Sequence, residues 1–120
     1  MKYLLLIYAN EADWDGMPEA EQGKIFQDYM DYTNAIAKSG HLLGAEALQP
    51  IATATTVRVK DGKTLTTDGP FAETREQLGG FYMVEAKDLD EAIALAARIP
   101  GARMGSIEVR PIMPTPPPEG

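Results

Sequence analysis

The pattern of hydrophobic and polar positions divides the chain into strands and helices. Two short runs, Tyr3–Ala9 and Phe81–Glu85, carry apolar residues on both faces, which is typical of strands covered on two sides. Near the end of the chain, Ile107 and Val109 alternate with polar residues, which indicates a half-covered strand. We therefore expect the two doubly apolar runs to be adjacent, antiparallel and central in a sheet, with the last strand at an edge.

A first amphipathic helix is predicted between Pro18 and Gly40, because apolar residues recur there every three or four positions. The preceding polar segment, Asn10–Met17, is expected to be a loop. We interpret the aromatic-rich stripe of this helix as core packing, with a ligand pocket as the alternative. Its members are Ile25, Tyr29, Tyr32 and Ile36, with Phe26, Met30, Thr33 and Ala37 beside them.

A second helix is predicted after Asp88, whose side chain can cap it, and it ends at Pro100–Gly101. The residues expected to face inward are Leu89, Ala92, Ile93, Ala96 and Ile99. Three more strands are predicted, the last two forming a hairpin that turns at Asp61–Gly62. Their ranges are His41–Leu48, Thr55–Lys60 and Lys63–Thr67.

The resulting order is β-α-β-hairpin-β-α-β, which is an α+β, ferredoxin-like plan with an antiparallel sheet and an inserted hairpin. In that plan both helices cover one face of the sheet. The other face also needs an apolar cover, and the simplest one is the same face of a second subunit. We therefore expect a homodimer.

Length and composition allow one domain, which we place at residues 1–113, followed by a disordered Pro-rich tail over residues 114–120. The chain has no cysteine, which excludes disulfides, thiolate catalysis and Cys-based metal sites. Its formal net charge of −7 argues against binding to nucleic acid or to an anionic membrane. The apolar start lacks the cleavage site of a signal peptide, so we expect a cytoplasmic protein.

The run from Asp68 to Glu76, Asp-Gly-Pro-Phe-Ala-Glu-Thr-Arg-Glu, is the most informative motif of the chain. Gly69 permits backbone angles that other residues avoid, and Pro70 fixes its own φ. The segment is therefore expected to be a rigid, ordered turn, with Asp68 accepting backbone N–H bonds and Phe71 largely buried as an anchor.

This run, together with Gln77-Leu78-Gly79-Gly80-Phe81, resembles the signature of the DGPF branch of the YCII-related family, and the resemblance extends from about Lys2 to Pro111. It implies a dimeric α+β barrel and no settled reaction. Shorter members of the family carry a proposed His–Asp pair whose histidine lies on the first helix. Here that helix has no histidine, while Asp68 remains at the position that corresponds to the acidic partner.

His41 is the only histidine and therefore the only side chain whose ordinary pKa suits proton transfer at neutral pH. A strand start and a turn leaving the hairpin can lie at one end of a small sheet, so His41 and Asp68 are the candidate catalytic pair. The alternatives are structural. His41 would then bond a helix end or water, and Asp68 would only stabilise its turn.

Phe71, Glu73 and Arg75 are candidate ligand-binding residues around Asp68. Arg75 is suited to a carboxylate or phosphate, although Glu73 and Arg75 can also pair with each other or be solvated. Gly79 and Gly80 mark a place where a backbone or a ligand approaches closely. No motif for a metal, a phosphate or a dinucleotide is present, so we expect no metal and no cofactor.

The sequence thus favours a small dimer that binds a small polar metabolite beside residues 68–75 and acts on it by cofactor-free acid–base chemistry. The alternative is a non-enzymatic regulatory or interaction protein, because members of the resembled family are often encoded beside alternative sigma factors. A third possibility, a cofactor-free monooxygenase or a haem-degrading enzyme, rests on fold analogy alone.

Overall fold

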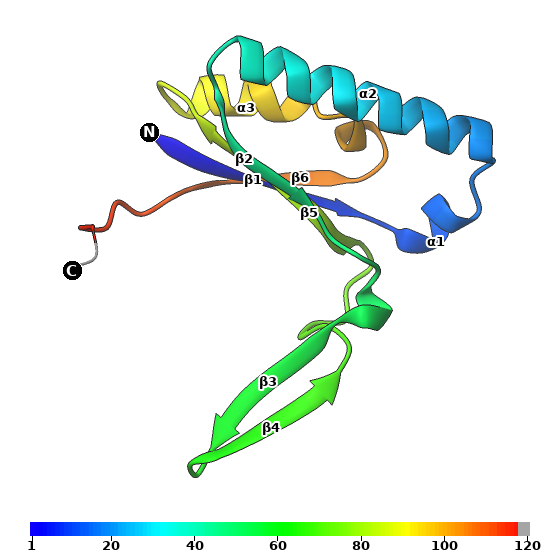
Figure 1. The fold of residues 1–120 in the computed structure, drawn as a ribbon, viewed down its shortest axis with the longest axis vertical. Coiled ribbons are helices and arrows are strands. Elements are labelled where there is room, and N and C mark those ends of the chain that lie inside the picture. The colour runs from blue at the N-terminus through cyan, green and yellow to red at the C-terminus, as the bar shows by residue number, and fades with distance from the viewer. Residues whose placement is uncertain (118–120) are drawn as a thin grey trace.

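The computed structural model describes residues 1–117 as a four-stranded sheet with helices on one face and a hairpin projecting from one end (Figure 1). The order of elements is β-α-β-hairpin-β-α-β, with a short additional helix after the first strand. The strands are β1 (Lys2–Ala9), β2 (Leu42–Ala47), β3 (Thr55–Lys60), β4 (Lys63–Asp68), β5 (Gln77–Glu85) and β6 (Ser106–Pro111). The helices are α1 (Glu11–Asp15), α2 (Glu19–Lys38) and α3 (Leu89–Ala97), with 3-10 turns η1 (Ile51–Thr53) and η2 (Pro100–Arg103).

The main sheet has the strand order β2-β5-β1-β6 and is antiparallel throughout. The doubly apolar strands β1 and β5 are the two central ones, and they pair with Leu5 opposite Tyr82. This confirms the prediction from their two-sided apolar pattern. Strand β6 lies at one edge, also as expected, and β2 lies at the other. The arrangement is consistent with a ferredoxin-like fold.

The hydrophobic core lies between the sheet and the two long helices. From the sheet, Tyr3, Leu5, Tyr82 and Val84 point toward the helices, which contribute Tyr32 and Ile36 of α2. The α3 side of the core is formed by Ala92, Leu95, Ala96 and Ile99. The prediction that Leu89 and Ile93 face inward is wrong, since each side chain is 49% exposed. The buried arc of α3 is rotated toward Leu95, which leaves these two side chains at its border.

The helix ends follow the chemistry of their residues. Gly40 adopts φ +83° directly after α2, a conformation that favours glycine. The Asp88 side chain accepts the Glu91 N–H at 2.9 Å, and Glu91 Oε1 accepts the Lys87 N–H at 3.1 Å. This reciprocal capping confirms the predicted start of α3.

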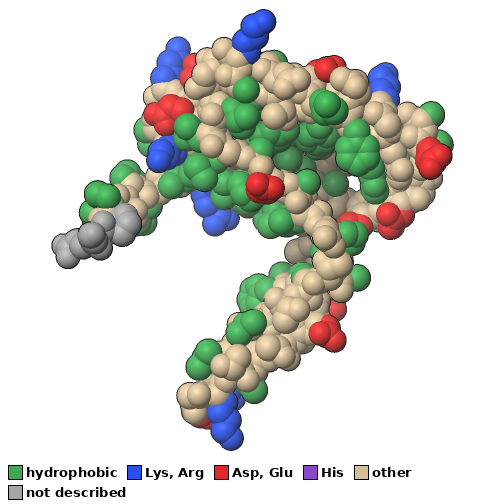
Figure 2. Space-filling model, viewed as in Figure 1, with side chains coloured by type: hydrophobic (Ala, Val, Ile, Leu, Met, Phe, Trp, Pro, Cys, Tyr) green, Lys and Arg blue, Asp and Glu red, His purple; other side chains and the backbone are tan. Residues whose placement is uncertain are grey.

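The face of the main sheet opposite the helices is not covered by any element of residues 1–117. Its apolar side chains come from alternate positions of the two central strands, and all of them are partly exposed: Leu4, Leu6, Tyr8, Phe81 and Met83. Figure 2 shows hydrophobic side chains gathered over the sheet, between the helices and the hairpin. The hairpin β3–β4 turns at Asp61 and Gly62, both with positive φ, as the sequence predicted.

Residues 114–117 form neither helix nor strand and are exposed. Residues 118–120, the end of the predicted tail, lie outside the described residues. Within residues 1–117 no helix is long and apolar enough to cross a membrane.

Candidate functional site

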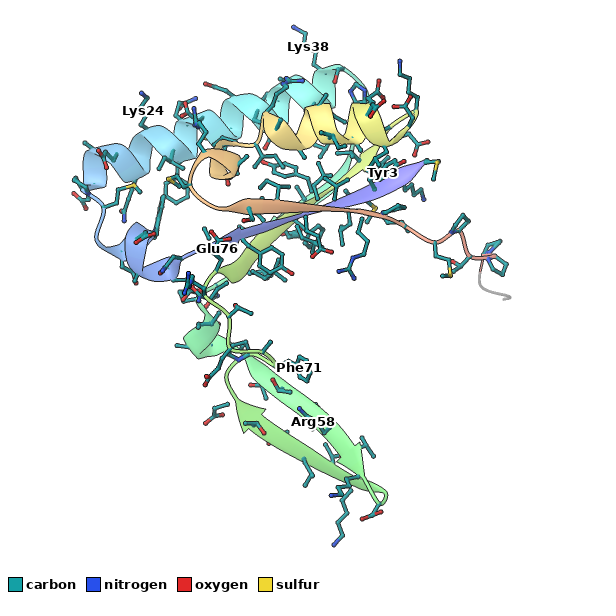
Figure 3. All side chains as sticks on the ribbon, turned by 180° about the vertical axis from the view of Figure 1, so that it is seen from behind. Tyr3, Lys24, Lys38, Arg58, Phe71 and Glu76 are labelled. Carbon is teal, nitrogen blue, oxygen red and sulfur yellow. The ribbon has the colours of Figure 1, made fainter. Side chains whose placement is uncertain are left out.

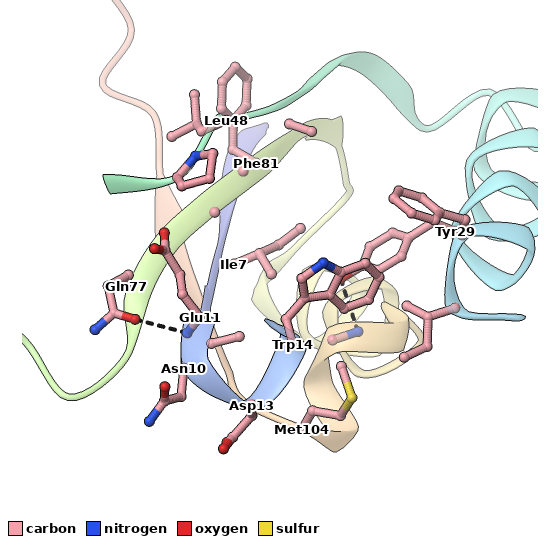
Figure 4. A pocket seen from close by; sticks show the side chains of 18 of the residues that line it. Ile7, Asn10, Glu11, Asp13, Trp14, Tyr29, Leu48, Gln77, Phe81 and Met104 are labelled. Atoms are coloured by element: carbon pink, nitrogen blue, oxygen red, sulfur yellow. Dashed lines mark hydrogen bonds between the residues drawn. The ribbon is translucent and has the colours of Figure 1, made fainter. Parts of the chain in front are cut away.

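A cavity of about 540 Å³ lies at the end of the sheet where β1 leaves for α1, beneath α1 and the first turns of α2 (Figure 4). Its walls are mainly apolar. They come from β1, α1, α2, β2, β5 and η2, so distant parts of the chain meet here. The residues that line the cavity include Ile7, Glu11, Trp14, Met17, Ile25, Phe26, Tyr29, Ala47, Gln77 and Met104.

Helix α1 forms one wall of the cavity. Asn10 caps this helix, and its Oδ1 accepts the Ala12 N–H at 2.9 Å. The Trp14 ring packs edge-on against Phe26 of α2, with 5.4 Å between ring centroids. Gln22 of α2 also donates its side-chain N–H to the Trp14 carbonyl at 2.8 Å. The loop expected over Asn10–Met17 is therefore wrong, because capping and these contacts with α2 stabilise a five-residue helix.

Glu11 and Gln77 connect α1 to the neighbouring strand and to η1. The Gln77 Oε1 accepts the Glu11 N–H at 3.0 Å, which Figure 4 marks. The Glu11 carboxylate accepts the Ile51 N–H through Oε2 at 3.0 Å. No other group in residues 1–117 bonds its Oε1. Glu11 is thus a partly buried, oriented carboxylate in the cavity wall with one acceptor oxygen remaining.

Tyr29 of α2 forms the inner end of the cavity, next to η2. Its hydroxyl oxygen accepts the Gly101 N–H at 3.1 Å, and burial raises the pKa of the phenol above its ordinary value. The hydroxyl therefore keeps its proton at neutral pH and remains a potential donor to a ligand. A Cβ added at Gly101 would lie 2.5 Å from the Tyr29 oxygen, so this contact requires the glycine.

His41 lies at the other end of β2, outside the lining of this cavity. Its Nδ1 is 2.7 Å from Ser39 Oγ, and its Nε2 is 3.2 Å from Glu91 Oε1. The His41 carbonyl accepts the Glu85 N–H at 2.8 Å, at the last residue of β5. The side chain therefore connects the end of α2 with the start of α3.

Asp68 ends the hairpin, which follows the opposite end of β2. It pairs with Thr55 in the hairpin ladder. The six residues of β2 alone span about 20 Å, so a single chain does not bring Asp68 and His41 together. The turn is held instead by the Gly69 N–H donating to the Ala54 carbonyl at 2.7 Å and by the Thr56 hydroxyl donating to the Gly69 carbonyl at 2.9 Å. In residues 1–117 the Asp68 side chain accepts no backbone N–H, so that expectation is wrong.

Phe71 is 77% exposed, so the prediction of a buried anchor is also wrong. Its ring instead lies beside the hairpin, with Arg58 Cζ 5.3 Å from the ring centroid (Figure 3). The loop is too far from the core to insert its ring there. Phe71 also lines a separate hollow of about 440 Å³, together with Pro70, Tyr8 and Leu78.

Glu73 and Arg75, the other two candidate ligand-binding residues, are exposed, and no ion pair joins them within residues 1–117. Neither lines the larger cavity. Their segment is connected to it through Gln77, whose side-chain N–H donates to the Thr74 carbonyl at 2.8 Å and to the Arg75 carbonyl at 3.4 Å. Among the described residues no three His, Asp or Glu side chains are grouped so as to hold a metal ion.

Two of the cavity elements that were not predicted have partial signals in the sequence. Asn10 followed by Glu11 and Asp13 is the pattern of an N-cap with acids in the first turn, and it marks α1. The aromatic-rich stripe of α2 was interpreted as core packing, with a ligand pocket as the alternative, and each interpretation holds for part of it. Tyr32 and Ile36 are core residues, whereas Ile25 and Tyr29 line the cavity.

Comparison with known families and proteins identifies the family of this chain. The family model of the YCII-related domain matches residues 1–116. An uncharacterized protein of Rhizobium meliloti (strain 1021) is 36% identical over 114 residues, which cover 93% of this chain and 92% of that protein. The chain belongs to the YCII-related family.

Proposed function

We propose that this YCII-related protein is a cytoplasmic homodimer that binds a small molecule in the cavity beneath α1. The observation that carries the proposal is the cavity itself, about 540 Å³ with mainly apolar walls and a few oriented polar groups. Cavities of this size and lining are typical of small-molecule sites. The polar groups are Glu11, Gln77 and the Tyr29 hydroxyl, each fixed by a hydrogen bond.

These walls favour a ligand with an apolar body and a polar group, rather than the wholly polar metabolite expected beside residues 68–75. For an acid–base reaction in this cavity, Glu11 is the carboxylate in position to accept a proton. His41 and Asp68 do not line it, and a reaction that uses both of them requires the two subunits of a dimer to bring them together. We therefore propose ligand binding as the primary function and acid–base turnover as dependent on Glu11.

Ligand binding can be measured through Trp14, since it is the only tryptophan of the chain and lines the cavity. We expect members of a small-molecule library to change its fluorescence and to raise the unfolding temperature. Ala47→Phe places a ring at the cavity wall and should abolish both effects. Ala52→Phe, an exposed position of η1 outside the cavity lining, is the matched control. If both variants respond like the original protein, the ligand does not bind in this cavity.

The proposed homodimer is supported by the uncovered apolar sheet face. Leu4, Leu6 and Met83 are partly exposed there, and a sheet buries its apolar faces against another layer. A second copy offers a face of the same shape and polarity. Light scattering should give about 26 kDa, twice the chain mass of 13.0 kDa. Leu6→Asp should yield monomers, whereas Ala94→Asp, at an exposed position of α3, should not. A wild-type mass of one chain would overturn the proposal.

One observation favours the alternative of an interaction protein. The hairpin projects from the sheet and exposes three apolar side chains, Val57 (59%), Val59 (70%) and Leu65 (47%). Val57 and Val59 lie on the same face of the hairpin, and neighbouring exposed apolar side chains of this kind are suited to a protein partner. Replacing Val57 and Val59 by threonine should leave small-molecule binding unchanged, so loss of ligand binding would contradict separate roles for hairpin and cavity.

A further inference from the structure

The charge of the cavity indicates which ligands it accepts. Four residues of its lining have charged side chains, and all four are acidic: Glu11, Asp13, Asp15 and Glu46. No lysine, arginine or histidine lines it. Arg103 precedes the lining residue Met104, but its Nη2 is paired with Asp28 Oδ2 at 3.3 Å. A ligand carboxylate or phosphate would therefore meet repulsion and no available cation.

Glu11 has the geometry of a cation-binding group in this wall. It is the only one of the four acids that is not exposed, so its charge is screened less by solvent. Its backbone is fixed by Gln77 and its Oε2 by the Ile51 N–H, while Oε1 is available. Burying such a carboxylate is unfavourable unless an opposite charge or hydrogen-bond donors compensate it. A ligand ammonium group supplies both.

Aromatic rings line the cavity beside Glu11 and across from it. Figure 4 shows Tyr29 of α2 across the cavity from Glu11, with the ring of Trp14, also from α1, between them. The ring of Phe26 packs nearly perpendicular to that of Trp14, with an interplanar angle of 88°. The faces of such rings attract cations and also bury hydrocarbon, and tryptophan does so most strongly. Ile7, Ile25 and Met17 complete an apolar surface for the rest of the ligand.

We propose that the cavity binds an amine, a molecule with an apolar body and a protonated amino group, and that the amino group pairs with Glu11. The body lies among Trp14, Tyr29 and the aliphatic side chains. This inference rests on the proposed small-molecule function and names its ligand class. It excludes carboxylates and phosphates of the same size as ligands of this cavity.

The test uses three probes of equal chain length and different charge, n-hexylamine, 1-hexanol and hexanoate, at pH 7. Trp14 fluorescence and calorimetry should show that the amine binds at least about tenfold more tightly than the alcohol, because a hydrogen bond to a charged group is worth more than a neutral one. Hexanoate should bind more weakly than the alcohol. Raising the salt concentration should weaken the binding of the amine and not that of the other two probes.

Glu11→Gln keeps an acceptor for the Ile51 N–H and removes the charge. It should reduce amine affinity about tenfold and leave alcohol affinity unchanged. Glu21→Gln, an exposed acid of α2 outside the lining, should change neither. Equal binding of amine and alcohol, or tighter binding of hexanoate, would overturn the amine inference while the cavity remained a ligand site. If neither these probes nor any library compound binds, both the inference and the proposed function fail.

Discussion

The side-chain amide of Gln77 joins residues 74–75 to the first residue of α1: its oxygen accepts the Glu11 N–H at 3.0 Å while its nitrogen donates to the Thr74 carbonyl at 2.8 Å. One side chain thus connects the end of the Asp-Gly-Pro-Phe segment to the cavity wall. The segment from Asp68 to Glu76 and the proposed ligand site are therefore joined through hydrogen bonds, although Phe71, Glu73 and Arg75 do not line the cavity.

Gln77→Ala should lower the free energy of unfolding by about 1–2 kcal/mol, because it removes the bond to Glu11 and those to the 74–75 carbonyls. It should also weaken ligand binding in the cavity, since α1 loses a fixed point. Urea unfolding at one fixed protein concentration measures the first effect, and Trp14 fluorescence titration the second. Gln49→Ala, an exposed glutamine, should change neither, and equal effects of the two variants would contradict a specific role for Gln77.

Gly80→Ala should destabilise the sheet by about 1–3 kcal/mol, the usual cost of overpacking. A Cβ at Gly80 would lie 2.8 Å from the Glu46 carbonyl oxygen and 3.3 Å from the Ala47 Cα, both backbone atoms of β2. Gly79→Ala is the matched control, because a Cβ there meets nothing within 4 Å. Comparing their urea midpoints tests this difference, and equal midpoints would show that β2 can move away.

Alkaline solution should destabilise the protein through its buried tyrosines. Burial raises the pKa of Tyr29, Tyr32 and Tyr82 above the ordinary value near 10. The folded state therefore keeps protons that the unfolded chain releases, and the free energy of unfolding should be constant up to about pH 10 and fall above it. Circular dichroism in urea at pH 8 to 11.5 measures this.

Tyr32→Phe should reduce that alkaline slope, since it removes one of the three groups. It should also cost about 1 kcal/mol at pH 8, because the Tyr32 hydroxyl donates to the Leu95 carbonyl at 2.7 Å. An unchanged slope in this variant would show that Tyr32 ionises equally in both states.

His41→Ala should lower stability by about 1 kcal/mol and leave ligand binding in the cavity unchanged. The variant loses the contacts with Ser39 and Glu91, but these lie at the far end of β2 from the cavity. Urea unfolding and Trp14 titration measure the two quantities. Asn34→Ala, an exposed position on α2, should change both by little. Loss of ligand binding with His41→Ala would favour an arrangement in which the partner subunit carries His41 to the site.

The sequence by itself determined the order of the main strands and helices, but not the short helix α1. Alternation and two-sided apolar runs placed β1 and β5 at the centre, and Asp61–Gly62 and Asp88 marked the hairpin turn and the start of α3. These features are local. They depend on which face of an element is buried and on the chemistry of one or two residues, and both can be read from spacing.

Only the tertiary structure decided which side chains meet. Within one chain His41 and Asp68 are separated because His41 precedes β2 and Asp68 ends the hairpin that follows it, and no periodicity reports which end of the sheet a turn occupies. Phe71 is exposed because its loop follows the hairpin away from the core. Glu11, Trp14, Tyr29 and Gln77 converge because strand pairing and helix packing bring together residues up to 66 positions apart, and such distances are a property of the assembled fold.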